Sequence, residues 1–312
     1  MHDSLILSRR LRVEGDSTLG LERGARSGVF VRVRPGAYLP TREWEAMDDR
    51  TRHRVSMDAF AMTSARRVVF AVESAAALHG IPIVGGWPAH PRVVSEADYS
   101  RRTRVGVEAR WRPVSDMEVV SIGGMRATSL ARTALDIAAE RDLVAGVVAL
   151  DHVIHSGAVH LVDLHAYVDS ARPFPGVRKV IAALALATGT AETPLESLSV
   201  VRFAQLGFDP PTQQREFVVD GQRYRADFSW EEAGVIGEAD GREKYLAGPD
   251  VLWKEKQRED ALRSVTRGFA RWGWDQAWAG APMAVRLERA GLRRNPRIAS
   301  RYAFRPPAIR GT

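Results

Sequence analysis

Two different periodicities follow one another near the N-terminus. Apolar residues recur at helical spacing over residues 4–14 and again over residues 16–26. After Gly28, residues 29–34 alternate with a period of two, and a Pro-Gly turn leads into a short strand at 37–39. Two helices followed by a β-hairpin are the pattern of a small winged helix-turn-helix.

The second helix and the hairpin of this segment are rich in arginine. In a winged helix-turn-helix the second helix enters the major groove of DNA and the hairpin contacts the backbone. Four arginines are therefore predicted to bind DNA phosphates: Arg23, Arg26, Arg32 and Arg34. A small helix-hairpin domain without a role in DNA binding is the alternative interpretation.

The middle region, residues 46–187, mixes helical and strand-like patterns. Helices are predicted at 52–64, 74–79, 130–139, 143–156 and 177–187, and strands at 93–95, 109–111, 119–122 and 125–128. The last two strands read as a hairpin on a Gly-Gly turn. Five histidines have no carboxylate at a recognisable ligand spacing and are expected to be core or surface residues: His79, His152, His155, His160 and His165.

A proline-rich boundary at 173–176 precedes a third region that begins near residue 188. Thr193 is expected to cap a helix that has Pro194 at its first position and ends at Gly207. The elements that follow are strands at 213–219, 223–230 and 235–240, a helix at 250–267, a strand at 269–274 and a helix capped by Asp275. This order of a helix, three strands, a helix and a strand predicts an α/β core.

The loop at 231–234 sets the register of the hairpin around it. Pairing Trp230 with Val235 places Asp227 opposite Glu238. Directly opposed carboxylates repel one another, and a divalent cation between them would remove that cost. Mg²⁺ is typically held by one or two carboxylates together with water and substrate phosphate. An amphipathic hairpin whose acidic residues face water is the alternative.

Other charged residues extend this candidate metal site. Glu196 on the preceding helix can complete a carboxylate cluster, and Lys244 follows Asp240 by four residues. A lysine near bound phosphate can orient the attacking water and offset developing negative charge. The predicted ligands of Mg²⁺, or of Mn²⁺, are therefore Asp227, Glu238 and Glu196, with Asp240 and Lys244 as further catalytic candidates.

The distribution of charge supports a polyanionic ligand for this region. The chain has a formal net charge of +7; residues 201–250 carry six basic and ten acidic side chains, whereas residues 251–312 carry fourteen basic and five acidic ones. Carboxylates can hold a cation while basic residues, such as Lys256 and Arg258, hold DNA phosphates. Two separately solvated faces would give the same distribution.

Composition narrows the cellular setting. The sequence has no cysteine, which excludes disulfides and thiolate metal sites and fits a reducing cytoplasm. No apolar stretch approaches the length of a membrane span, and the apolar cluster near the N-terminus is too short for a signal peptide. A cytoplasmic protein without a membrane segment is therefore predicted.

Short motifs in the last region resemble the very-short-patch-repair-like (Vsr-like) branch of the PD-(D/E)XK nucleases. They are residues 194–197 (PLES), 226–228 (ADF), 237–241 (GEADG), 244–245 (KY) and 258–260 (RED). The resemblance implies that Glu196, Asp227 and Glu238 bind Mg²⁺. The superfamily has a catalytic lysine two residues after the second-strand glutamate, where this sequence has Asp240; an acidic residue at that position is common in this branch.

The front and middle of the chain also show a resemblance. Residues 32–38 (RVRPGAY), 74–82 (SAAALHGIP) and 128–136 (TSLARTALD) are similar to AbiEi-type antitoxins of type IV toxin-antitoxin systems. Together the two resemblances imply an α+β multidomain protein. It would have a winged helix-turn-helix at 1–45, a mixed α/β middle domain at 46–187 and a restriction-endonuclease-like α/β core with a basic tail at 188–312.

Two functions follow from these predictions. The first is a DNA-binding, Mg²⁺-dependent endonuclease that hydrolyses phosphodiester bonds. The second is a non-catalytic DNA-binding regulator of the antitoxin type, in which the nuclease-like region is a scaffold for a homodimer, a toxin or another protein partner. The aspartate at position 240 is the main support for the second.

Overall fold

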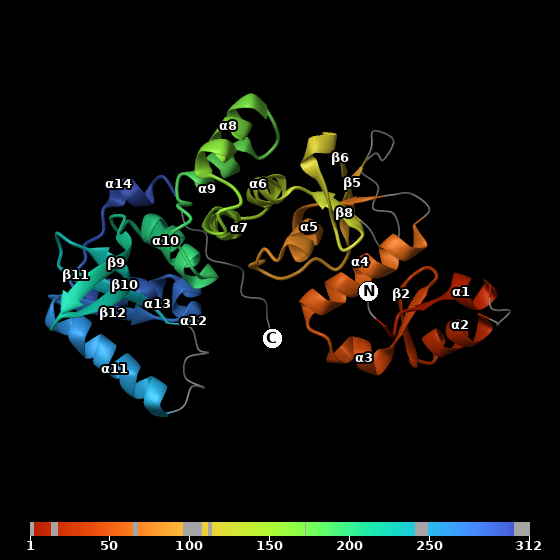
Figure 1. The fold of residues 1–312 in the computed structure, drawn as a ribbon, viewed down its shortest axis with the longest axis horizontal. Coiled ribbons are helices and arrows are strands. Elements are labelled where there is room, and N and C mark those ends of the chain that lie inside the picture. The colour runs from red at the N-terminus through yellow and green to blue at the C-terminus, as the bar shows by residue number, and fades with distance from the viewer. Residues whose placement is uncertain are drawn as a thin grey trace. The chain divides into compact units, whose positions relative to one another are not determined.

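A computed structural model describes residues 3–13, 18–64, 68–95, 108–111, 114–171, 173–240 and 249–302. The chain divides into two compact units, Met1–Glu140 and Arg141–Thr312 (Figure 1). Both mix helices and strands, so the predicted α+β class is confirmed. The domain boundaries predicted at residues 45 and 187 fall inside these units. Within the described ranges, no helix has the length and apolar character needed to cross a bilayer.

The N-terminal sheet contains the predicted hairpin. Its strands are β1 (Ile6–Leu7), β3 (Ala37–Pro40) and β2 (Phe30–Arg34), in that order, all antiparallel. The neighbouring helices are α1 (Ser8–Val13), α2 (Leu19–Arg26) and α3 (Thr41–Ala46). Gly36 has a φ of +85°, which the tight turn between β2 and β3 requires and glycine adopts without strain.

The predicted first helix is wrong at its N-terminal end. Ile6 and Leu7 form a strand that pairs with Tyr38 and Ala37, and the helix begins only at Ser8. The reason is packing: Leu7 is buried in a cluster with Ala37 and Ala59, residues far along the chain. The C-terminal end predicted for this helix and the cap predicted for the next lie at residues 14–17, outside the described residues.

A five-stranded sheet forms the rest of the first unit. Its strands run in the order β6 (Glu108–Trp111), β5 (Arg92–Ser95), β4 (Val69–Phe70), β8 (Met125–Thr128) and β7 (Val119–Ile122). The helices are α4 (Asp49–Thr63), α5 (Val72–His79) and α6 (Leu130–Glu140), with a short 3₁₀ turn at Asp116–Glu118. The hairpin predicted on Gly123 and Gly124 is confirmed, and both glycines have positive φ.

Buried ion pairs cross the core of this unit. Arg92 on β5 donates to both carboxylate oxygens of Glu73 on α5, at 3.0 and 3.3 Å, and also pairs with Glu140. Arg92 and Glu73 are only 6% and 0% exposed. A buried charge is tolerated when a partner and hydrogen bonds compensate its desolvation, as each does here for the other.

His53 on α4 is buried with a fixed pattern of hydrogen bonds. Its Nδ1 lies 2.8 Å from the carbonyl oxygen of Pro88, which can only accept, so Nδ1 carries the proton. Its Nε2 lies 2.9 Å from the Ser74 hydroxyl, which itself accepts from the backbone N–H of Arg92 at 2.8 Å. The hydroxyl can donate to Nε2 while it accepts from Arg92. Burial lowers the pKa of His53, which favours the neutral imidazole.

This arrangement makes the stability of the first unit sensitive to acid. An unfolded histidine has a pKa of about 6.5 and binds a proton more readily than buried His53. The stabilising contribution of neutral His53 is present above that pH and is lost as the pH falls through the lower pKa of the folded state. Urea unfolding at about pH 5 and about pH 8 should show this loss. It should be smaller in His53→Gln and unchanged in the exposed control His165→Gln; an equal loss in all three proteins would contradict the assignment.

The second unit begins with a group of helices. They are α7 (Leu143–His155), α8 (Leu161–Ala171), α9 (Val177–Leu184) and α10 (Pro194–Leu206). Within α10 the predicted signals are confirmed: the Thr193 side chain accepts from the backbone N–H of Glu196, Pro194 is the first helical residue, and Gly207 follows the last turn with a φ of +85°.

A four-stranded sheet follows in the order β12 (Gly268–Trp272), β11 (Val235–Ala239), β10 (Gln222–Trp230) and β9 (Thr212–Val219). The last three strands are antiparallel, and β12 runs parallel to β11 after the crossover helix α11 (Pro249–Ser264). The predicted order of helix, three strands, helix and strand is therefore confirmed. The helices α12 (Trp274–Ala279), α13 (Ala281–Arg289) and α14 (Pro296–Ala299) complete the unit (Figure 1).

The cap predicted at Asp275 is wrong by two residues. Helix α12 already begins at Trp274, and its N-cap is Gly273. The backbone N–H of Gly273 donates to the side-chain oxygen of Gln276 at 2.7 Å, so a side chain inside the first turn closes this end of the helix.

The two faces of the sheet are packed differently. On one face, Phe203 of α10 makes edge-to-face contacts with Phe228, Trp230 and Trp272, with ring centroids 5.0–5.6 Å apart. Gly237 permits this packing, because a Cβ atom there would lie 2.7 Å from Trp272. On the other face, Ala226 and Ile236 pack with Leu262 of α11.

Candidate active site

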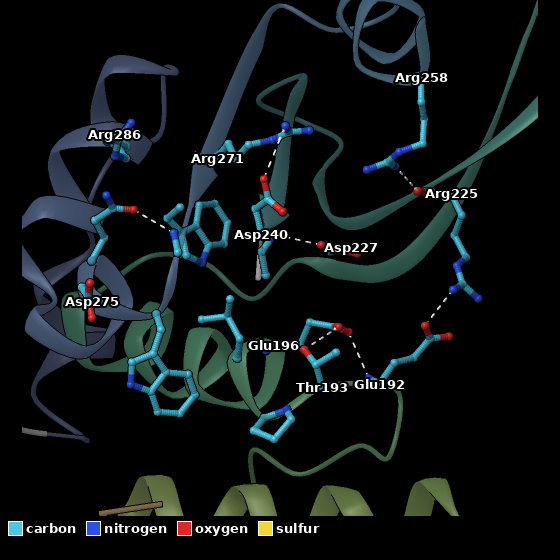
Figure 2. A pocket seen from close by; sticks show the side chains of 17 residues that line it. Glu192, Thr193, Glu196, Arg225, Asp227, Asp240, Arg258, Arg271, Asp275 and Arg286 are labelled. Atoms are coloured by element: carbon cyan, nitrogen blue, oxygen red, sulfur yellow. Dashed lines mark hydrogen bonds and ion pairs between the residues drawn. The ribbon is translucent and has the colours of Figure 1, made fainter. Parts of the chain in front are cut away.

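A cavity of about 1170 Å³ opens at one end of the four-stranded sheet (Figure 2). It is lined by the N-terminal end of α10, by β10, by the ends of β11 and β12, and by residues of α11, α12 and α13. Among the residues that the structure describes, five acidic ones line it: Glu192, Glu196, Asp227, Asp240 and Asp275. Four described arginines accompany them: Arg225, Arg258, Arg271 and Arg286.

Glu196 lines this cavity from the first turn of α10 and is 4% exposed. Its carboxylate accepts from the backbone N–H of Glu192 at 3.0 Å, from the Thr193 hydroxyl at 2.8 Å and from the Gln214 amide at 2.7 Å. With the bond from its own N–H to Thr193, this is a reciprocal capping arrangement. Glu196 therefore holds the end of α10 in place and presents an oriented carboxylate to the cavity.

Asp227 lines the cavity from β10. The register predicted for the hairpin is confirmed for the pairs of Trp230 with Val235 and Phe228 with Gly237, where the ladder ends. Beyond that point the Asp227 carboxylate accepts from the backbone N–H of Ala239 at 2.8 Å. A negatively charged acceptor is thus fixed against the end of β11, as Figure 2 shows.

Glu238 does not belong to the residues that line the cavity. It alternates with Gly237 along β11, so it lies on the face covered by α11, and it is 2% exposed. Its carboxylate forms an ion pair with Arg258 of α11, which also donates to the carbonyl oxygen of Arg225 at 2.9 Å. The structure therefore brings Asp227 and Glu196 to one cavity and holds Glu238 in a buried pair.

Asp240 follows β11 and faces the cavity. It pairs with Arg271 of β12 at 3.5 Å, and Arg271 also pairs with Glu259 of α11 at 3.0 Å. Arg225 pairs with Glu192 at 2.8 Å on the opposite side (Figure 2). Lys244, the other catalytic candidate, lies outside the described residues.

The predicted DNA-binding residues differ in their solvent exposure. Arg23 and Arg26 are exposed in the last turn of α2, Arg32 is exposed on β2, and Lys256 is exposed on α11. Arg34 instead places its guanidinium 4.4 Å from the centre of the Phe60 ring, and burial lowers the pKa of Arg34. Arg34 is thus engaged in packing.

The acidic residues of the cavity fit a magnesium ion in their chemistry. Mg²⁺ prefers oxygen ligands and needs only one or two carboxylates with water and phosphate, which Asp227 and Asp240 can supply. In the described ranges, no three histidine or acidic side chains stand close enough to form a protein-only metal site. The carboxylates would therefore hold the ion together with a bound phosphate.

Sequence reasoning missed part of the cavity wall. Arg271, Trp274 and Arg286 all line it; the first two were not predicted as site residues, and Arg286 was predicted only as one of the arginines of the basic C-terminal tail. A signal for Arg271 existed in the strand predicted at 269–274, because a crossover helix places that strand parallel to the one at 235–240. Trp272 and Trp274, at the end of that predicted strand, line the cavity as well.

Comparison with models of protein families and with curated proteins found no match for this chain.

Proposed function

We propose that the protein is a DNA-binding endonuclease whose C-terminal unit hydrolyses phosphodiester bonds with Mg²⁺ or Mn²⁺. The observation that carries this proposal is the cavity lined by Glu196 from helix α10, by Asp227 from within β10 and by Asp240 from the end of β11. The order of elements around it supports a restriction-endonuclease-like core of the PD-(D/E)XK type. Arginines beside the carboxylates suit a ligand that carries both a cation and phosphates.

Each group has a distinct role in this proposal. Asp227 and Asp240 would hold the metal ion, which lowers the pKa of a bound water and stabilises charge on the phosphate. Glu196 orients the end of α10 and adds negative potential at the site. Arg258 and Arg271 lie beside these acids and can take up phosphate oxygens when DNA enters the cavity.

The N-terminal helices and hairpin would bring the enzyme to DNA. Arg23, Arg26 and Arg32 are exposed and could contact phosphates, as a winged helix-turn-helix would use them. Binding through such contacts falls steeply as salt concentration rises. A cytoplasmic location, expected from the composition, is part of the same proposal.

A second function is favoured by the ion pairs that two acidic residues form with arginines. Glu238 is sealed in an ion pair with Arg258, and Asp240, at the position of the nuclease lysine, pairs with Arg271. A site neutralised in this way suits a non-catalytic DNA-binding regulator of the AbiEi antitoxin type. The nuclease-like unit would then bind a toxin, another protein or a second copy of the chain.

Cleavage of supercoiled plasmid separates the two functions. We expect nicking in Mg²⁺ or Mn²⁺, none in EDTA, and a rate about a hundredfold lower in Asp227→Ala and in Asp240→Ala, because the metal ion loses a ligand. Glu232→Ala is the matched control: this acid is exposed in the loop between β10 and β11 and lies outside the cavity. Intact plasmid with every protein, together with a retained gel shift, would leave the regulator as the function.

A further inference from the structure

One wall of the cavity carries a stack of flat groups. The rings of Trp274 and Trp278 on α12 are 6.0 Å apart and inclined by 14°. The guanidinium of Arg202 on α10 lies 5.8 Å from the centre of the Trp278 ring. The same arginine donates to the carbonyl oxygens of Ala277 and Trp278 at 2.8 and 3.0 Å, so α10 holds α12 and its rings in a fixed position.

Trp274, the member of this stack that lines the cavity, is partly exposed to solvent. Trp274 lines the cavity and is 38% exposed, although Trp278 already packs against its ring. A rigid, partly exposed aromatic face on a charged cavity is what stacking of a planar ligand requires. Because the ring is held in place before any ligand arrives, little conformational entropy would be lost on binding.

Arg286 on α13 lines the same cavity, on the side where Asp275 lies (Figure 2). The other three arginines of the cavity each pair with a carboxylate: Arg225 with Glu192, Arg258 with Glu238 and Arg271 with Asp240. Among the residues that the structure describes, the Arg286 guanidinium has no such pair. Its charge is available to an anionic group of a ligand.

We propose that Trp274 and Arg286 form a subsite for one unpaired nucleotide of a DNA strand. The base stacks on the Trp274 ring, and Arg286 pairs with a neighbouring phosphate. Bases within a duplex stack on each other, so their faces are most accessible to an aromatic side chain in a single strand or after extrusion from the helix. The subsite deepens the proposed function, because it names the form of DNA that the cavity takes, and it rests on the DNA-binding part of that function alone.

Binding measured without metal tests the subsite. Fluorescence anisotropy in EDTA would compare a short oligothymidylate with an abasic oligonucleotide of equal length. We expect Trp274→Ala to weaken oligothymidylate binding about tenfold, Trp274→Phe to weaken it much less, and neither to change binding of the abasic strand. Trp253→Ala is the matched control, because Trp253 is 60% exposed on α11 and lies outside the cavity.

Arg286→Ala should behave differently from the tryptophan variants. It removes a phosphate contact, so it should weaken the binding of oligothymidylate and of the abasic strand to the same extent. It should also reduce the slope of log K against log salt concentration by about one. Equal binding by Trp274→Ala and Trp253→Ala, or equal losses on the abasic strand, would overturn the proposal.

The outcome is independent of catalysis. The binding assay contains EDTA, so it is carried out without the metal ion that the proposed cleavage needs. A protein that cleaves plasmid but shows no dependence on Trp274 would refute the subsite and leave the nuclease. A protein that never cleaves but needs Trp274 to bind single strands would refute the nuclease and leave the subsite.

Discussion

Replacing Arg92 with methionine is expected to lower the free energy of unfolding of the first unit by about 3–5 kcal/mol. The substitution leaves Glu73, which is 0% exposed, as a buried carboxylate without its main cation. Removing one member of a buried pair costs more than the pair contributes, because the remaining charge keeps its desolvation penalty. Urea denaturation of the full chain, followed by circular dichroism, measures the change.

Two further variants show whether the loss comes from the stranded charge. The double variant Glu73→Gln/Arg92→Met should recover much of the stability, since a neutral amide replaces the buried carboxylate that lost its cation. Arg223→Met removes an exposed pair with Glu216, at 78% and 60% exposure, and should change stability by less than about 1 kcal/mol. An Arg92→Met protein as stable as Arg223→Met would contradict this account.

Arg258→Met is expected to have the second largest effect, a loss of about 3 kcal/mol from the second unit. Glu238 is 2% exposed, and its carboxylate would lose the guanidinium that compensates its burial. The measurement is again urea unfolding of the full chain. Lys256→Met, an exposed change on the same helix, is the control and should be close to neutral.

The companion variant Glu238→Gln separates a structural glutamate from a metal ligand. A structural Glu238 predicts that Glu238→Gln/Arg258→Met regains stability and that Glu238→Gln leaves the metal concentration needed for nicking unchanged. A rise of about tenfold or more in that concentration would show that Glu238 turns toward the ion when metal binds. In that case the ion pair between Glu238 and Arg258 would be the arrangement of the site without metal.

The sequence was most informative where structure is set by neighbouring residues. The Thr193 cap, Pro194 and Gly207 delimit α10 through local hydrogen bonds and backbone angles, and these were predicted correctly. The register of Trp230 with Val235 follows from the length of the loop between them. Such features need no knowledge of the rest of the fold.

Features that depend on distant partners were predicted poorly. Ile6 and Leu7 were predicted to be helical but form a strand, because burial of Leu7 beside Ala37 outweighs local preference. The predicted meeting of Asp227 and Glu238 assumed a regular ladder, whereas the paired ladder stops at Phe228 and Arg258 holds Glu238 on the other face. The direction of an acidic side chain there depends on a helix that begins ten residues after β11 ends.

The aromatic packing on one face of the second sheet has a practical consequence. Phe203, Phe228, Trp230 and Trp272 interlock over Gly237, and none of these contacts involves a carboxylate of the cavity. The aromatic packing of this face and the carboxylates of the cavity therefore come from different side chains. A protein built in this way can exchange acidic groups of the cavity while its aromatic core is preserved.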